Sequence, residues 1–218
     1  MASAIFNFFL PSLCPRCHEA PGPILCLSCH DALPRIAHPC SCCGATRLSA
    51  TAPCHTCDDR GLAHIDRVHA AMLYVGTASE LIGNAKAGAK PAAIAALSVL
   101  LPLPETPIHA IIPVPPSPGR RPGPHLATAC ARWAAHQLKV PCLHILRCTR
   151  HAREQHRLSR ADRARNVSGL FTCRGTAPER VLLVDDILTS GATASAAAAA
   201  LRQAGARRII ATFLCRTP

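Results

Sequence analysis

Two adjacent aspartates, Asp185 and Asp186, follow four apolar residues (181–184) that predict a buried strand. Two residues later the chain has small and hydroxylated residues, which are Thr189, Ser190, Gly191, Ala192 and Thr193. Ligands of open α/β sheets bind beyond the carboxyl ends of strands, and N–H groups of a loop that opens a helix bind anions. Both carboxylates are expected to face the crevice there. The pattern predicts a site for a ligand with hydroxyl groups and a phosphate, such as a ribose 5-phosphate. A simple strand–helix turn with a capping Asp is the alternative, but it explains only one acid.

Metal binding is the second chemistry that the sequence predicts. Eight of the fourteen cysteines form four C-x-x-C pairs, which are Cys14/Cys17, Cys26/Cys29, Cys40/Cys43 and Cys54/Cys57. Two thiolates at this spacing bind one ion from a tight turn, and two such turns complete a tetrahedral Zn²⁺ site. A short segment with few aliphatic residues cannot fold by burial alone, so the metal would supply folding free energy. A disulfide framework and a thioredoxin-like redox pair are the alternatives, and the repeated spacing favours zinc.

The simplest pairing of the cysteines is sequential, with one zinc ion in each half of the segment. A cross-braced pairing stays open, and Cys42 could replace Cys43 as a ligand. We expect two structural ions, because four protein ligands leave no position for a substrate. The isolated cysteines are expected to be small buried apolar residues, and they are Cys130, Cys142, Cys148, Cys173 and Cys215.

Strands and helices alternate in the rest of the chain. Apolar runs predict strands at 68–75, 108–114, 142–146, 181–184 and 208–214, and helices at 78–85, 92–101, 125–138 and 194–204. This alternation predicts an α/β fold, a parallel sheet with helices on both faces. Seven arginines and little apolar periodicity predict a mobile, exposed segment at 147–165. We place a domain boundary near residue 66, with a double zinc ribbon at 1–66 and the α/β domain at 67–218.

The overall composition predicts a soluble, cytoplasmic protein. Hydrophobic residues make up 49% of the 218 residues, which is enough for a core, and no apolar run has the roughly 18–20 residues of a membrane span. The apolar run at 5–10 is shorter than that of a signal peptide. The formal charge of +12 attracts polyanions, although an arginine-rich composition also arises from a GC-rich genome.

The stretch from Val181 to Thr193 resembles the phosphoribosyl-diphosphate (PRPP) signature of the type I phosphoribosyltransferases. The resemblance implies that Asp185 and Asp186 bind the ribose hydroxyls and that residues 189–193 bind the 5-phosphate. It also implies a diphosphate-binding loop, for which Pro113, Val114 and Pro115 are the match, and Mg²⁺ bound with the diphosphate. Lys86 and an arginine of the 147–165 segment are further candidate diphosphate ligands, and these arginines are Arg147, Arg150 and Arg153.

The order of motifs resembles the ComF (ComFC/GntX-like) family, which joins a double zinc ribbon to a phosphoribosyltransferase domain. The motifs are the cysteine pairs, Tyr74-x-Gly76, Lys86-x-Gly88, Ile112-Pro113-Val114-Pro115 and the residues from Gln155 to Phe171. This resemblance implies transfer of a phosphoribosyl group from PRPP to an unknown acceptor with release of diphosphate. Relatives are linked to natural competence, so single-stranded DNA and competence or recombination proteins are expected partners.

The chain departs from this family at Pro122-Gly123-Pro124-His125-Leu126, where relatives typically have R-G-F-N-Q. The lost polar groups are expected to contact substrate or to shape the start of the helix. A non-catalytic, single-stranded-DNA-binding competence factor that uses PRPP as a signal, or not at all, is therefore the alternative. A third possibility is a structural zinc module that docks a partner. The sequence does not predict the acceptor or the oligomeric state.

Overall fold

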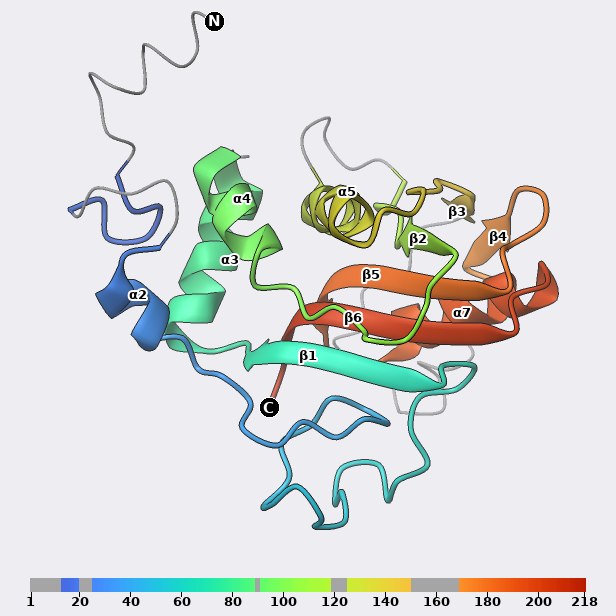
Figure 1. Ribbon diagram of the computed structural model, residues 1–218, viewed down its shortest axis with the longest axis horizontal. Coiled ribbons are helices and arrows are strands. Elements are labelled where there is room, and N and C mark those ends of the chain that lie inside the picture. The colour runs from blue at the N-terminus through green and yellow to red at the C-terminus, as the bar shows by residue number, and fades with distance from the viewer. Residues whose placement is uncertain (1–12, 20–24, 89–90, 119–124, 150–168) are drawn as a thin grey trace, which may run out of the picture.

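The structure, a computed structural model, describes residues 13–19, 25–88, 91–118, 125–149 and 169–218. A four-stranded parallel sheet lies at its centre, with the strand order β1-β6-β5-β2 (Figure 1). The strands are β1 (Arg67–Leu73), β2 (Ala110–Pro113), β5 (Arg180–Leu188) and β6 (Arg208–Arg216). All three pairings are parallel. The mixed α/β architecture with a parallel sheet is therefore confirmed.

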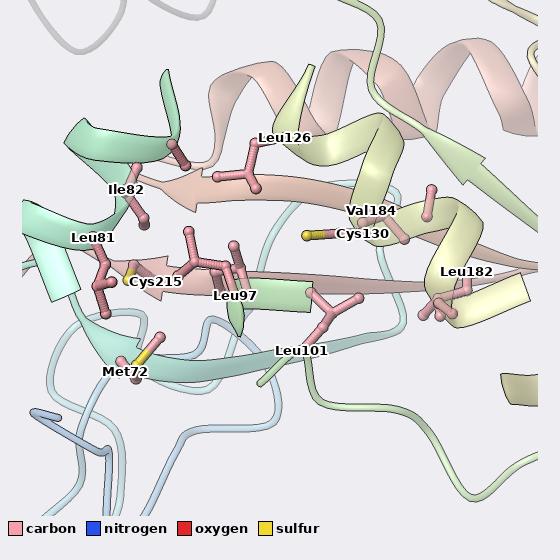
Figure 2. Close-up of a cluster of buried hydrophobic side chains, with 14 of the residues drawn as sticks. Met72, Leu81, Ile82, Leu97, Leu101, Leu126, Cys130, Leu182, Val184 and Cys215 are labelled. Carbon is pink, nitrogen blue, oxygen red and sulfur yellow. The ribbon is translucent and has the colours of Figure 1, made fainter. Parts of the chain in front are cut away.

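Helices cover both faces of this sheet (Figure 1). One face packs against α3 (Gly76–Gly88), α4 (Pro91–Ser98) and α5 (Leu126–Leu138), and the other packs against α7 (Ala192–Gln203). Each strand contributes side chains to both layers, because successive side chains of a strand point to opposite faces of the sheet. On β5, Leu182 and Val184 face the first layer, whereas Val181 and Leu183 face α7. Figure 2 shows side chains of the first layer packed together, among them Leu97, Leu126 and Leu182.

The alanine-rich sequence of α7 explains how that helix packs. Its buried residues are Ala194, Ala197, Ala198, Ala200 and Leu201. Alanine is the strongest helix former, and its methyl group lets the helix approach the strands closely. The helix begins after Gly191 and ends before Gly205, two glycines with positive φ. The predicted helix at 194–204 is thus present and starts two residues earlier.

The predicted strand at 142–146 is wrong in part. Near residue 142 the chain makes a single parallel bridge to Ile111, with N–H···O distances of 2.9 and 2.8 Å on the two sides. It then leaves the sheet, and β3 (Leu146–Cys148) pairs antiparallel with β4 (Phe171–Cys173). Leu146 and Phe171 are both buried against the α7 layer, so their burial favours this second pairing. The start of the 147–165 segment is therefore a strand.

The second cysteine segment (residues 34–66), which carries Cys40, Cys43, Cys54 and Cys57, packs along the outer edge of β1. The N–H groups of Ile36, Val68 and Leu73 join this segment to the strand at 2.8–3.2 Å. The first cysteine segment includes α2 (Leu27–Asp31) and contacts α3 through the Arg16–Glu80 ion pair, at 3.2 Å. Covering an exposed strand edge removes a site for unwanted strand pairing. The boundary at residue 66 stays a prediction. None of the helices in the described ranges has the length and apolar character that crossing a bilayer requires.

Candidate functional site

The strand that carries the two aspartates extends four residues beyond its predicted end. Pairing of β5 with β2 stops at Val184, but pairing with β6 continues to Leu188, opposite Arg216. Asp185 and Asp186 therefore lie inside β5, in the part that projects beyond β2. Neighbouring residues of a strand point to opposite faces, so the two carboxylates flank the edge of the sheet and do not share one side of it. The expectation that both carboxylates face the same crevice is therefore wrong.

Asp186 lies on the face that α3, α4 and α5 cover. Its Oδ2 atom is 2.8 Å from Nζ of Lys86, in the last turn of α3, and its side chain is 12% exposed. Two charges at this distance in a partly buried position attract each other more strongly than on an open surface. The fold thus brings Lys86, a candidate chosen from the sequence, to an aspartate that is one hundred positions away.

Asp185 lies on the opposite face, below the start of α7. One of its carboxylate oxygens accepts a hydrogen bond from the N–H of Asp186 at 2.9 Å. Together with Thr189, Gly191 and Thr193 it lines a cavity of about 40 Å³, which has room for an ordered water molecule. Burial, followed by the charge of Asp186, raises the pKa of the Asp185 carboxyl to about 7. The group therefore changes charge near neutral pH, where a bound cation or hydroxyl group would favour its ionised form.

The loop between β5 and α7 opens a helix, as many anion-binding loops do. Gly191 is the N-cap of α7 and has φ +79°, a left-handed conformation that glycine adopts without strain. The first N–H groups of a helix have no acceptor within the helix, and they point toward the loop. Thr189 and Ser190 are exposed, and Thr193 is half-buried, so their hydroxyl groups are accessible. The structure brings Asp185 and this loop together, as predicted.

The predicted diphosphate loop lies one strand away. Pro113 is the last residue of β2, opposite Val184, and the N–H of Val114 donates to the Val184 carbonyl at 2.9 Å. Pro113 ends β2, an edge strand of the sheet, where proline is tolerated. Pro115 is half-buried at the same sheet edge. Residues 113–115 therefore lie beside the projecting part of β5.

The arginine candidates lie elsewhere or outside the described ranges. Arg147 is an exposed residue of β3. Arg150 and Arg153 fall outside the described residues, as does most of the 147–165 segment. Of the altered segment Pro122–Leu126, only His125 and Leu126 are described, and Leu126 is buried as the first residue of α5.

Two residues near the loop were not identified from the sequence. Arg216, at the carboxyl end of β6, is only 8% exposed, and its Nη1 donates to the carbonyl of Thr189 at 3.5 Å. Leu62 packs on Gly191 so closely that a Cβ at position 191 would lie 2.5 Å from Leu62 Cδ2. The position of Arg216 at the end of a predicted parallel strand could have identified it. No local pattern points to Leu62, because its partner is 129 positions away.

The cysteines form two separate groups of four. Cys14, Cys17, Cys26 and Cys29 make the first and Cys40, Cys43, Cys54 and Cys57 the second, with the sulfur atoms of each group within 4.8 Å of one another. Three Sγ–Sγ distances are 4.0, 3.9 and 3.6 Å. Tetrahedral zinc with Zn–S bonds of about 2.3 Å separates its sulfur ligands by about 3.8 Å. The residues fit two zinc ions, the pairing is sequential, and none of the fourteen cysteines is in a disulfide.

Each C-x-x-C pair forms the same backbone turn. The residue after the second cysteine donates its N–H to the carbonyl of the first cysteine, at 2.7–3.0 Å, and the donors are His18, His30, Gly44 and Asp58. This turn places two sulfur atoms on one side of the backbone. Cys42 lies outside the group of four and its N–H donates to Cys40 Sγ at 3.4 Å, so Cys43 is the ligand position. Cys130 and Cys215 are buried as predicted, whereas Cys142, Cys148 and Cys173 are half-buried.

Comparison with models of known protein families gave no match, and a search of curated proteins gave no significant match. Two features of the chain bear on its function: the projecting edge of β5 with its loop, and the two four-cysteine groups.

Proposed function

We propose that the protein binds PRPP at the carboxyl edge of the sheet and transfers its phosphoribosyl group to an unidentified acceptor, with release of diphosphate. One observation carries the proposal: Asp185, Asp186, Lys86 and the loop at 189–193 meet at one edge of a parallel sheet. The two carboxylates supply acceptors for ribose hydroxyls, and the loop supplies donors for a phosphate. No simple strand–helix turn needs all of these groups.

The roles of the residues follow from their chemistry. Thr189, Ser190 and Thr193 are expected to donate hydroxyl hydrogen bonds to the 5-phosphate, together with the first N–H groups of α7. The carboxylates of Asp185 and Asp186 accept hydrogen bonds from the ribose. As the bond between C1 and the diphosphate oxygen breaks, C1 gains positive charge, which nearby carboxylates stabilise. The acceptor, expected to be a nitrogen nucleophile, then forms the new bond to C1.

The leaving diphosphate needs positive charge near residues 113–115. Lys86, whose Nζ lies 2.8 Å from Asp186 Oδ2, is the cation expected to contact the diphosphate. Carboxylate oxygens of Asp185 and Asp186 are ligands that suit Mg²⁺. Mg²⁺ bound with PRPP would offset the charge of the leaving group. An acceptor must approach C1 from the face opposite the diphosphate.

We further propose that the chain is a ComF-like protein with a type I phosphoribosyltransferase-like domain after a double zinc ribbon. The two four-cysteine groups, their place ahead of the sheet and the parallel α/β core support this proposal. Zinc would hold the ribbons folded, and the second ribbon reaches the loop through Leu62.

A thermal-shift measurement followed by a turnover assay tests the function. PRPP with Mg²⁺ should raise the melting temperature of the wild type, and Asp185→Asn with Asp186→Asn should abolish the shift. A matched control is Asp58→Asn with Asp59→Asn, an exposed aspartate pair whose left-handed backbone asparagine tolerates. Diphosphate release is then followed with nitrogen acceptors and with water. An unchanged shift in the first double variant would reject the ribose site.

Binding of single-stranded DNA without catalysis is the second candidate function, and the net charge of +12 favours it. Only seven of the residues are aromatic, which limits stacking of bases. Binding that comes from counterion release falls steeply with salt. A salt-resistant component in a titration with labelled single-stranded DNA would support this second function.

A further inference from the structure

A large cavity lies between the second cysteine segment and the outer side of α7. Its volume is about 900 Å³, within the range of sites for small molecules. Residues 56–64 form one wall, and the loop at 189–192 with Ser195, Ala196 and Ala199 forms the other. Asp185, Asp186 and Lys86 are not part of this lining. We call this space the ribbon–helix cavity.

Contacts at two places hold the walls together. Leu62 packs on Gly191 beside the loop. Farther along, Arg202 of α7 donates to the carbonyl of His64 at 3.2 Å and pairs with Asp66 at 2.7 Å. Asp66 also accepts the N–H of Ile209 at 2.6 Å, which ties the segment to β6. Apolar packing and hydrogen bonds therefore fix the two walls of the cavity relative to each other.

A buried cation lies at the loop end of this cavity. Arg216 is 92% buried, and the one side-chain hydrogen bond that it makes within the described part of the chain is the 3.5 Å contact to the Thr189 carbonyl. The cavity lining contains a single carboxylate, Asp58, which pairs with the exposed Arg60 at 3.4 Å. The side chain of Arg216 lines the cavity, and a guanidinium has five N–H donors in a fork that matches phosphate. The free donors of Arg216 thus point to an anionic ligand.

We propose that the ribbon–helix cavity binds a phosphate ester of nucleotide size, with its phosphate on Arg216. Thr189 and Ser190 lie next to this position and add hydroxyl donors. The less polar part of the ligand lies over Ala196 and Ala199, where small side chains leave space for a flat group. Cys43 and Cys57 also line the cavity, and with zinc bound their thiolates would keep the phosphate at the Arg216 end. The site shares the hydroxyl groups of Thr189 and Ser190 with the proposed PRPP site, and it differs in using Arg216 and not Asp185, Asp186 and Lys86.

Calorimetric titration with adenosine 5′-monophosphate (AMP), and with adenosine as the probe without phosphate, tests the proposal. The wild type should bind AMP at least tenfold more tightly than adenosine. Arg216→Gln should lower AMP affinity to that of adenosine, because only the phosphate contact is lost. Ala199→Leu, which fills the cavity without changing its charge, should weaken both probes. Arg207→Gln, at an exposed arginine, should bind as the wild type does.

The aspartate variant separates this proposal from the PRPP site. Asp185→Asn with Asp186→Asn should keep its AMP affinity, even where it loses PRPP. Loss of AMP binding in that variant would place the nucleotide at the aspartate edge and overturn the proposal. So would the absence of AMP binding to the wild type, or wild-type affinity in folded, zinc-loaded Arg216→Gln and Ala199→Leu. If Arg216→Gln does not fold, the AMP and adenosine affinities of Ala199→Leu alone test the proposal.

Discussion

The contact between Gly191 and Leu62 predicts a specific pattern of stability changes. At φ +79°, an alanine in place of Gly191 costs roughly 1–2 kcal/mol from the backbone alone. Its Cβ would lie 2.5 Å from Leu62 Cδ2 and 3.0 Å from Cδ1, so Leu62 must move. Overpacking of this kind costs about 1–3 kcal/mol. We therefore expect Gly191→Ala to lower the free energy of unfolding by about 2–5 kcal/mol.

A double-mutant cycle separates the two causes. Leu62→Ala removes the obstructing methyl groups, and it should cost about 1–2 kcal/mol by itself because Leu62 is half-buried. In the Leu62→Ala background, Gly191→Ala should cost only the backbone part of about 1–2 kcal/mol. The coupling between the two sites is then about 1–3 kcal/mol. Chemical denaturation at a fixed zinc concentration measures it, and strictly additive costs would refute the proposed contact.

Three further predictions concern the metal groups and the aspartate edge. Metal analysis should find two zinc ions per chain, with one lost in Cys43→Ser and both kept in Cys42→Ser; loss of zinc from Cys42→Ser would contradict the ligand assignment. Because the pKa of Asp185 is raised to about 7, the folded state holds this proton more tightly than the unfolded chain, so ionisation destabilises the fold as pH rises from about 4 to 7. Asp185→Asn should therefore gain stability relative to the wild type between pH 5 and pH 8 in thermal melts, and a constant difference would reject the shift. Lys86→Gln should leave Asp186 without its ion-pair partner and weaken PRPP binding at least about tenfold, and unchanged affinity would remove Lys86 from the site.

The sequence predicted those parts of the fold that depend on local pattern. Apolar runs such as 181–184 and 208–214 placed the central strands, and the alanines of α7 placed its helix. The C-x-x-C spacing placed the zinc ligands, since two thiolates in one turn are a local feature. The end of β5 was missed because Asp185 and Asp186 are polar, and polar residues rarely continue a strand. Here β6 extends equally far and supplies the backbone partners.

Long-range contacts account for the other misses. The pairing of Leu146 with Cys173 joins segments that are far apart in the chain, and the apolar run at 142–146 does not indicate which segment it pairs with. Lys86 could be named as a candidate, but its pairing with Asp186 depends on how α3 lies over the sheet. Arg216 and Leu62 act through partners that only the folded chain brings near.

Calorimetric titration of PRPP with Mg²⁺ tests the central claim most directly. Saturable binding of one PRPP per chain is expected for the wild type and for Asp58→Asn with Asp59→Asn. Asp185→Asn with Asp186→Asn should weaken binding at least about tenfold, because hydrogen bonds to charged groups contribute about 1.5–3 kcal/mol each. Equal PRPP affinity in all three proteins, or no binding to any of them, would contradict the assignment of the aspartate edge as a phosphoribosyl site.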